Sequence, residues 1–260
     1  MRLTLIFLFS LLSSSLAFSQ KLIKEMEIKN FHWAGLHPSG ELYIAADDAI
    51  KHFNPNGDLL NELKISLNEV NSLDGWHLTQ FVLFHPSSRQ IKTYNPQLEE
   101  RSFFYIDSVF AMDPQKIAGS YDQKSFWIVD AADNSLKKVN AKIGEVTIDV
   151  PLAEIKSQDI LFIREYQQFL FVVGAQQVYV YNGMGKKIKS IAKSPSQTIE
   201  FYGEEIFVLN EAEISLTDLF TNEKRKITLP VKFNSVLIAE DRLVGFTQNK
   251  VSIYNFKLPE

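Results

Sequence analysis

The chain of 260 residues contains no cysteine. This absence excludes disulfides, thiolate metal ligands, a thiol nucleophile and dithiol redox chemistry. Small exported domains often depend on disulfides, whereas a chain of this length can bury enough apolar surface without them. We therefore expect a fold held by its core alone, with any chemistry supplied by oxygen and nitrogen side chains.

Long apolar segments are also missing after the first 20 residues. An apolar run over Leu3–Leu12 follows Arg2 and leads to the small-residue end Ala17-Phe18-Ser19. This pattern is typical of a secretory signal peptide, and the run is too short to span a bilayer, which needs ~20 residues. We predict cleavage after Ser19, no lipoprotein cysteine, and a mature chain in the periplasm or the medium. The alternatives are a buried N-terminal strand and a membrane anchor.

Positive charge is in slight deficit. The chain has 27 Lys and Arg against 31 Asp and Glu, a net charge of −4. Removal of Arg2 with the signal peptide would take one positive charge and leave −5. Nucleic acids and anionic lipids both bind to basic surfaces. The balance therefore argues against either of them as the main partner.

The feature that the sequence does have is a phrase that occurs six times. Each copy consists of an apolar strand, a short polar turn and an alternating strand that ends on Asn or Asp. The copies are Glu41–Asn54, Gln80–Asn95, Ser125–Asn140, Gln168–Asn182, Glu205–Asp218 and Arg242–Asn255. Their last residues are 41, 45, 42, 36 and 37 positions apart. A period of this size indicates a repeat architecture.

Each repeat predicts four strands. The first strand of the phrase is apolar on both faces, as in Phe126–Val129, and the second alternates, as in Leu136–Val139. These patterns are typical of a fully buried strand and of a strand with one wetter face. A further strand follows each closing turn, as in Leu59–Ile65, and an inner strand precedes each phrase, as in Thr198–Tyr202. The unit is a four-stranded antiparallel meander of ~40 residues, the size of a propeller blade.

Six such units over residues 21–260 resemble a six-bladed β-propeller, and among propellers they look most like the NHL and two-component-regulator-like propellers of bacterial envelopes. The Gly-His and Trp-Asp dipeptides of WD40 repeats are missing. The resemblance implies an all-β fold with one domain over residues 20–260. The sixth unit stops after Lys250–Asn255, while Leu22–Ile28 has strand character and no unit of its own. We predict that this N-terminal strand completes the last blade, because pairing the two ends removes an exposed edge. The alternative is a loose leader.

One group of residues is a candidate binding site. Asp47 and Asp48 fall in the turn of the first unit, and Asp74, Trp76 and His77 fall at the entry of the second. In a propeller these two kinds of loop emerge on the same face. We predict an acidic patch with an aromatic platform there, suited to a sugar, a cation or a basic peptide. The alternative is that Asp and Gly are simply turn residues.

Metal binding and catalysis find little support. The five histidines lie in the first third of the chain, but no pair has the i, i+2 strand spacing or i, i+4 helix spacing of a metal site. We predict no metal and no cofactor. No Gly-x-Ser-x-Gly elbow occurs. Asp107, Asp159 and Glu200 lie at the entries of inner strands and are candidate channel residues or turn caps.

These observations predict an exported, non-catalytic β-propeller that acts as a protein- or ligand-binding scaffold in the bacterial envelope. An envelope protein or peptide is the expected partner, and a position peripheral to the outer membrane is compatible with this reading. The alternative is a propeller hydrolase or lyase acting on glycans or lactones. A funnel of carboxylates and histidines at the channel would favour the enzyme, and an apolar or aromatic patch would favour protein binding.

Overall fold

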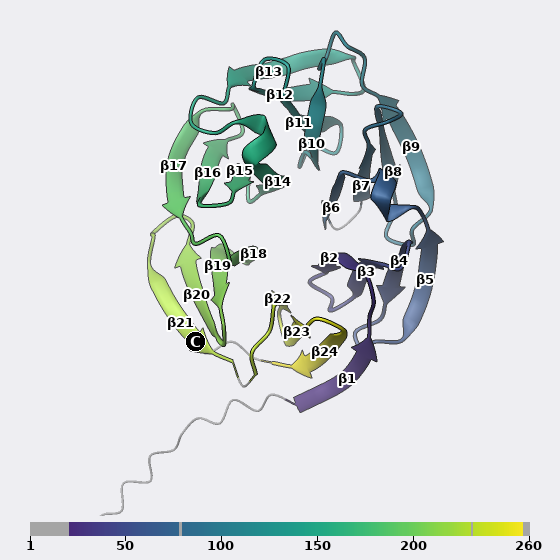
Figure 1. The fold of residues 1–260 in the computed structure, drawn as a ribbon, viewed down its shortest axis with the longest axis vertical. Coiled ribbons are helices and arrows are strands. Elements are labelled where there is room, and N and C mark those ends of the chain that lie inside the picture. Colours follow the sequence, from purple (N-terminus) through teal and green to yellow (C-terminus); the bar gives the residue numbers. More distant parts are fainter. Residues whose placement is uncertain (1–20, 78–79, 230, 257–260) are drawn as a thin grey trace, which may run out of the picture.

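The computed structural model describes residues 21–77, 80–229 and 231–256, with all side chains in these ranges except those of Trp76 and His77. The predicted signal peptide, residues 1–19, lies outside the described residues. Six four-stranded antiparallel sheets form a ring (Figure 1). The predicted all-β, six-bladed propeller is confirmed. None of the described residues belongs to a helix long and apolar enough to cross a membrane.

Five of the blades run outward from the centre of the ring in sequence order, and the sixth runs from β22 to β24 and ends with β1. The inner strands are β2 (Phe31–Leu36), β6 (Ser72–His77), β10 (Pro114–Gly119), β14 (Ile160–Tyr166), β18 (Thr198–Tyr202) and β22 (Ser235–Ala239). The second strands are β3 (Leu42–Ala46), β7 (Gln80–His85), β11 (Ser125–Asp130), β15 (Phe169–Gly174), β19 (Glu205–Asn210) and β23 (Arg242–Phe246). The third strands are β4 (Ala49–Phe53), β8 (Gln90–Tyr94), β12 (Ser135–Asn140), β16 (Gln177–Asn182), β20 (Glu213–Asp218) and β24 (Lys250–Asn255). The outer strands are β5 (Leu59–Lys64), β9 (Glu100–Tyr105), β13 (Glu145–Pro151), β17 (Lys187–Ala192), β21 (Lys224–Thr228) and β1 (Lys21–Glu27).

The core lies between neighbouring blades. The second strands are buried on both faces, as predicted, because each face of a blade packs against another blade; every residue of β11 is buried. Trp127 in β11 is fully buried, and its indole Nε1 donates to the carboxylate of Glu165 in the next blade. The hydrogen bond satisfies the one polar atom of a large apolar side chain.

The Asn or Asp that ends each phrase has a structural role. In the first five blades, its side-chain oxygen accepts backbone N–H groups of the following turn. Asn54 Oδ1 accepts from Asn56 and Asp58, both at 2.9 Å. Asn182 Oδ1 accepts from Met184 at 3.0 Å and from Lys186 at 2.9 Å. These Asx turns fix the path from the third strand to the outer strand, which explains why the repeat ends on these two residue types.

The segment expected to form a loop at Asp74–His77 is a strand instead. It is the inner strand β6, and His77 pairs with Gln80 of β7. Gly75 serves close packing rather than a turn, since a Cβ there would lie 2.6 Å from the rings of Trp33 and Phe81. Asp74 is buried, and its Oδ2 accepts the backbone N–H of Gly119 in β10 at 2.9 Å. Asp74 is a residue type that favours turns, but here it stabilises the contact between the inner strands β6 and β10.

The two ends of the chain close the ring, as predicted. Strand β1 pairs antiparallel with β24, from Lys21 opposite Asn255 to Glu27 opposite Lys250. After β1, the backbone N–H of Ile28 donates to the carbonyl of Asn249 at 2.9 Å, and Ile28 is buried in the core shared by the first and last blades.

Deleting Lys21–Asn30 from the mature protein should lower the thermal midpoint by about 10 °C, because the last blade loses its outer strand, the buried Ile28 and the partly buried Ile23 and Met26, worth several kcal/mol together. Differential scanning calorimetry measures the shift. The double variant Lys24→Gln, Glu25→Gln is the control: it removes two exposed ion pairs that the strand makes with Asp58 and Lys250. Exposed pairs contribute about 0–1 kcal/mol each, so its midpoint should barely change. A truncated protein with the same thermal midpoint as the full-length mature protein would contradict ring closure by β1.

Candidate functional site

The ring has two faces, which we name by the direction of the inner strands. The entry face carries the starts of the inner strands and the turns between second and third strands. Phe31 at the start of β2, for example, pairs with Ala46, next to the turn at Asp47. The exit face carries the ends of the inner strands and the turns that lead into the outer strands.

Asp47 and Asp48 lie on the entry face. They form the turn between β3 and β4 and have φ values of 52° and 55°. Asp48 accepts the backbone N–H of Leu67 through Oδ1 at 3.3 Å, and its carbonyl accepts that of Ile65 at 2.9 Å. Both carboxylates are exposed beside the connection that leads into the second blade.

The other predicted site residues are not gathered with them. Strand β6 runs from the entry face to the exit face, so Trp76 and His77 lie at its far end. Asp74 is buried between them and the entry face. The expectation that all five residues share one face is therefore wrong, because it assumed a loop where the chain forms a strand.

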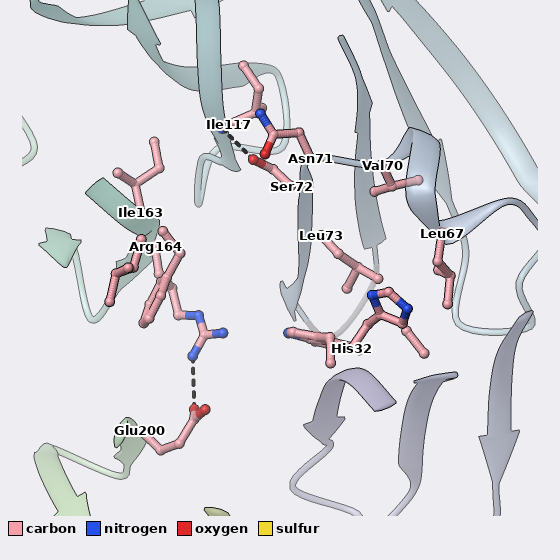
Figure 2. A pocket seen from close by; sticks show the side chains of 14 residues that line it. His32, Leu67, Val70, Asn71, Ser72, Leu73, Ile117, Ile163, Arg164 and Glu200 are labelled. Carbon is pink, nitrogen blue, oxygen red and sulfur yellow. Dashed lines mark hydrogen bonds and ion pairs between the residues drawn. The ribbon is translucent and has the colours of Figure 1, made fainter. Parts of the chain in front are cut away.

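The entry end of the central channel holds a pocket of about 330 Å³ (Figure 2). Nine of its fourteen lining residues are apolar, which leaves five polar ones. Leu161, on β14, is the most exposed apolar side chain of the lining. The polar residues are His32, Asn71, Ser72, Arg164 and Glu200. The polar groups nevertheless contribute more of the pocket's accessible surface than the apolar ones, so the cavity is framed by apolar residues and has a largely polar surface.

An ion pair spans the pocket between blades four and five. Arg164 Nη1 lies 3.0 Å from Glu200 Oε2, and the two side chains are 7% and 21% exposed (Figure 2). The guanidinium carbon also lies 5.3 Å from the ring centres of Phe162 and Phe201. Burial raises the pKa of Glu200, and the charge and hydrogen bond of Arg164 oppose that rise. The only carboxylate in the lining is therefore held by an internal cation.

The polar side chains at the start of β6 cover the edge of β10. The amide of Asn71 donates to the carbonyl of Gln115 at 2.7 Å, and Ser72 Oγ accepts the N–H of Ile117 at 3.1 Å. With Asp74, they satisfy backbone groups that would otherwise face the channel. This role was not predicted from the sequence, although polar residues cluster at the start of this inner strand.

The histidines are dispersed. His32 lies in the pocket, whereas His52 is buried and stacks on Tyr43 with ring centres 4.2 Å apart. Burial lowers the pKa of His52 and, with the charge of Lys92, that of His85. Within residues 21–77, 80–229 and 231–256, no group of three or more His, Asp or Glu side chains is placed to hold a metal ion.

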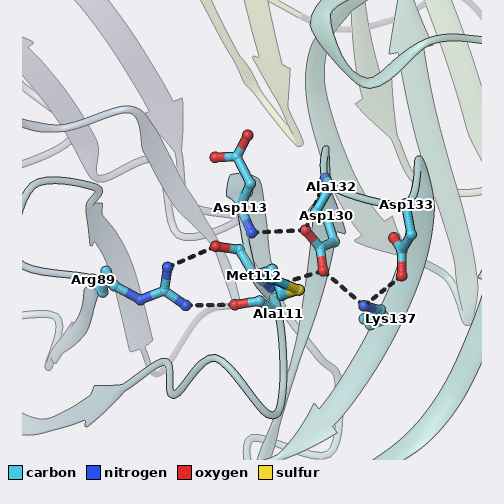
Figure 3. Close-up of polar contacts among 8 residues, drawn as sticks. All are labelled: Arg89, Ala111, Met112, Asp113, Asp130, Ala132, Asp133 and Lys137. Atoms are coloured by element: carbon cyan, nitrogen blue, oxygen red, sulfur yellow. Dashed lines mark hydrogen bonds and ion pairs between the residues drawn. The ribbon is translucent and has the colours of Figure 1, made fainter.

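The connection from blade two to blade three is held rigidly on the entry face (Figure 3). Arg89 donates to the carbonyls of Ile106, Ala111 and Met112. The buried carboxylate of Asp130 accepts the N–H groups of Met112 and Asp113 and pairs with Lys137 at 2.7 Å. Burial acts to raise the pKa of Asp130, but these hydrogen bonds together hold it below its ordinary value.

The remaining channel candidates are turn residues. Asp107 is exposed, and its Oδ1 accepts the N–H of Val109 at 3.0 Å. Asp159 ends the short 3-10 turn η2 (Ser157–Asp159) and is exposed. Of the three acidic residues expected at inner-strand entries, Glu200 alone lines the pocket.

These features define a six-bladed β-propeller with a pocket at one end of its channel. Among solved structures, the chain is similar to a streptogramin B lyase, with a TM-score of 0.60 over 90% of this chain and 98% of that one. It is also similar to virginiamycin B lyase from Staphylococcus aureus (TM-score 0.57; 91% and 99% covered) and to the WD40 domain of Toxoplasma gondii coronin (0.57; 89% and 70%). Each is 10% identical to this chain, so the likeness shows the fold alone. No protein-family model and no curated protein matches the sequence.

Replacing Arg164 by Met should destabilise the fold by about 3 kcal/mol at pH 8, because Glu200 is left as an uncompensated buried charge. The pKa of Glu200 is raised in the folded state, so its favourable contribution is present at low pH and is lost as pH rises through that pKa. The loss should therefore be clearly smaller at pH 5, where Glu200 can bind a proton. Urea denaturation at both pH values tests this. Arg164→Met, Glu200→Leu is the control and should lose the pH dependence; an equal loss at both pH values for the single variant would contradict the assignment.

Proposed function

We propose that this protein is an exported, non-catalytic β-propeller that binds a partner protein or peptide in the bacterial envelope through its entry face. The observation that carries the proposal is the lining of the channel pocket, in which a few polar side chains converge and the one carboxylate is already paired with Arg164. A concave site with a few convergent polar groups and an exposed apolar side chain, Leu161, is the usual form of a binding site.

The rival function is hydrolysis or elimination on a glycan or lactone. Two of the similar solved structures are lyases by name. Such chemistry needs an acid and a base positioned on the substrate. The pocket offers His32 and Glu200 as its titratable acid–base groups, and the Glu200 carboxylate is held by Arg164 at 3.0 Å. This lining supports binding better than turnover.

The proposed surface includes Asp47 and Asp48, which lie on the entry face and would meet basic groups of the partner. Trp76 and His77 lie at the other end of β6 and form no part of this surface. Export is proposed from Arg2, the apolar run Leu3–Leu12 and the small residues before Gln20. Mass spectrometry of protein from the periplasmic fraction tests it, since a cleaved chain begins at Gln20.

The variant Leu161→Glu should weaken partner binding at least about tenfold while the fold stays intact, because the substitution replaces the most exposed apolar side chain of the pocket wall by a charged one. A photo-crosslinking residue at position 161 first captures and identifies the partner in cells. Binding of that purified partner is then titrated with Leu161→Glu and with Leu60→Glu, a matched change of an exposed leucine on β5. Equal weakening in both variants would contradict the proposal. Turnover of a lactone or glycan that His32→Ala abolishes would establish the enzyme instead.

The double variant Asp47→Asn, Asp48→Asn separates a binding role from a turn role. Asn tolerates positive φ and keeps a side-chain acceptor, so unfolding free energy should change by less than about 0.5 kcal/mol. Binding of the same partner should weaken and lose part of its salt dependence, since two charges are removed from the interface. Unchanged affinity with unchanged salt dependence would leave the two aspartates as turn residues only.

A further inference from the structure

The channel pocket adjoins a second, larger cavity on the entry face. This cavity has a volume of about 1070 Å³ and lies between blades three and four. Its walls come from the connection between β13 and β14 and from the turn between β15 and β16. Leu161, the most exposed apolar side chain of the channel pocket, lines this cavity as well. The two cavities therefore meet at one leucine and form a single groove, the entry groove, which runs outward from the channel to Tyr179 on β16.

Hydrogen bonds to the backbone fix the walls of the second cavity. Asn134 Nδ2 donates to the carbonyl of Leu152 at 2.7 Å, and its Oδ1 accepts the N–H of Ser157 at 2.7 Å. The hydroxyl of Tyr179 donates to the carbonyl of Glu154 at 3.1 Å. These bonds hold the connection between β13 and β14 against blades three and four. The groove is thus formed before a ligand binds, which lowers the entropy cost of binding.

Three glutamines offer their side chains to the entry groove. Gln158, Gln176 and Gln177 line the second cavity and are exposed. The structure shows no hydrogen bond from their side-chain amides to any described residue. Each amide carries two N–H donors and a carbonyl acceptor. A ligand in which N–H and C=O groups alternate can therefore satisfy the donor and the acceptor of the same glutamine.

The charges of the entry groove balance. In the channel pocket, the one carboxylate is held by Arg164. In the second cavity, Glu154 is paired with Lys187. The charged residues that remain in the lining of that cavity are Lys156 and Asp159, which are both exposed and of opposite sign. A groove without surplus charge has no electrostatic attraction for a strongly charged ligand, so its chemistry suits an uncharged polar chain.

The shape of the groove separates the remaining classes of ligand. The aromatic residue among the described lining residues of the second cavity is Tyr179, and it is buried, so a sugar would find no open ring to pack on. A folded domain presents a convex surface that can fill one cavity, but Leu161 stands between the two. An extended chain can pass over this leucine and enter both cavities.

We propose that the entry groove binds an extended, uncharged polypeptide segment of the partner, with an apolar side chain against Leu161 and backbone hydrogen bonds to the three glutamines. This inference rests on the proposed function and names the kind of partner that the entry face accepts. Backbone N–H and C=O groups that leave water need new partners, and the glutamine amides supply them. Extended peptides are commonly recognised in this way, with backbone bonds for affinity and pockets for side chains.

Panning of a phage-displayed library of random peptides tests the proposal, with residues 20–260 as the bait. Peptides of about ten residues reach roughly 35 Å when extended, so one peptide can enter both cavities. Enriched peptides should carry little net charge and an apolar residue. Leu161→Glu and the double variant Gln158→Ala, Gln176→Ala should each weaken their binding at least about tenfold. Gln97→Ala, Gln248→Ala is the matched control: it removes two exposed glutamines outside the groove and should bind as the wild type does.

Photo-crosslinking tests whether the two cavities act as one groove. A benzoylphenylalanine at position 176 should crosslink the same peptide that one at position 161 captures, whereas one at position 248 should not. Thermal midpoints establish that all variants are folded, as expected for exposed positions.

Several outcomes would overturn the proposal: no enriched peptide, strongly charged enriched peptides, equal loss of binding in both double variants, or capture at position 161 without capture at 176. A partner that is captured in cells at position 161 and is not displaced by the enriched peptides would also overturn it, while the proposed function would stand. Peptides that bind in the groove when no protein is captured in cells would support the extended ligand and count against the proposed function.

Discussion

The antiparallel pairing of β1 with β24 is the constraint on which the rest of the molecule depends. In a ring of blades, the second strand of each blade packs between two neighbouring blades only if the first and last blades are also in contact. The strand that joins them comes from the N-terminus, and it supplies the last outer strand and Ile28 to the shared core. The burial of apolar side chains all around the ring is therefore tied to one pair of strands far apart in sequence, which favours cooperative unfolding.

Within the closed ring, polar side chains decide what the channel becomes. Inner strands have one edge without a strand partner, and bare backbone groups there would be costly to bury. Asn71, Ser72 and Asp74 satisfy that edge in blade three, and Arg164 bridges to Glu200 between blades four and five. What is left is a small cavity at the entry end, in which polar side chains lie among apolar ones. Interblade polar contacts thus shape the pocket as much as its apolar lining does.

Much of the fold could be predicted from sequence because its determinants are local and repeated. A few neighbouring residues are enough to predict such features. Examples are the Asx turns at Asn54 and Asn182 and the strand Phe126–Val129, which is apolar on both faces. The candidate site was harder, since its geometry comes from contacts between blades. Asp74 and Gly75 look like a turn in isolation, but the ring of Phe81 and the N–H of Gly119 make them a packed strand. The pairing of Arg164 with Glu200, 36 residues apart, has no local pattern at all.

In the Asx turns, one position fixes the backbone and a neighbouring position faces solvent. One side-chain oxygen specifies the backbone path, and the side chain two positions later is exposed in blades one, four and five. Substitution there alters the character of the face without disturbing the sheet behind it. Asn56, Met184 and Phe220 occupy the same place in three blades and differ completely in polarity. Such a scaffold can acquire a new surface one side chain at a time, with each change independent of the stability of the ring.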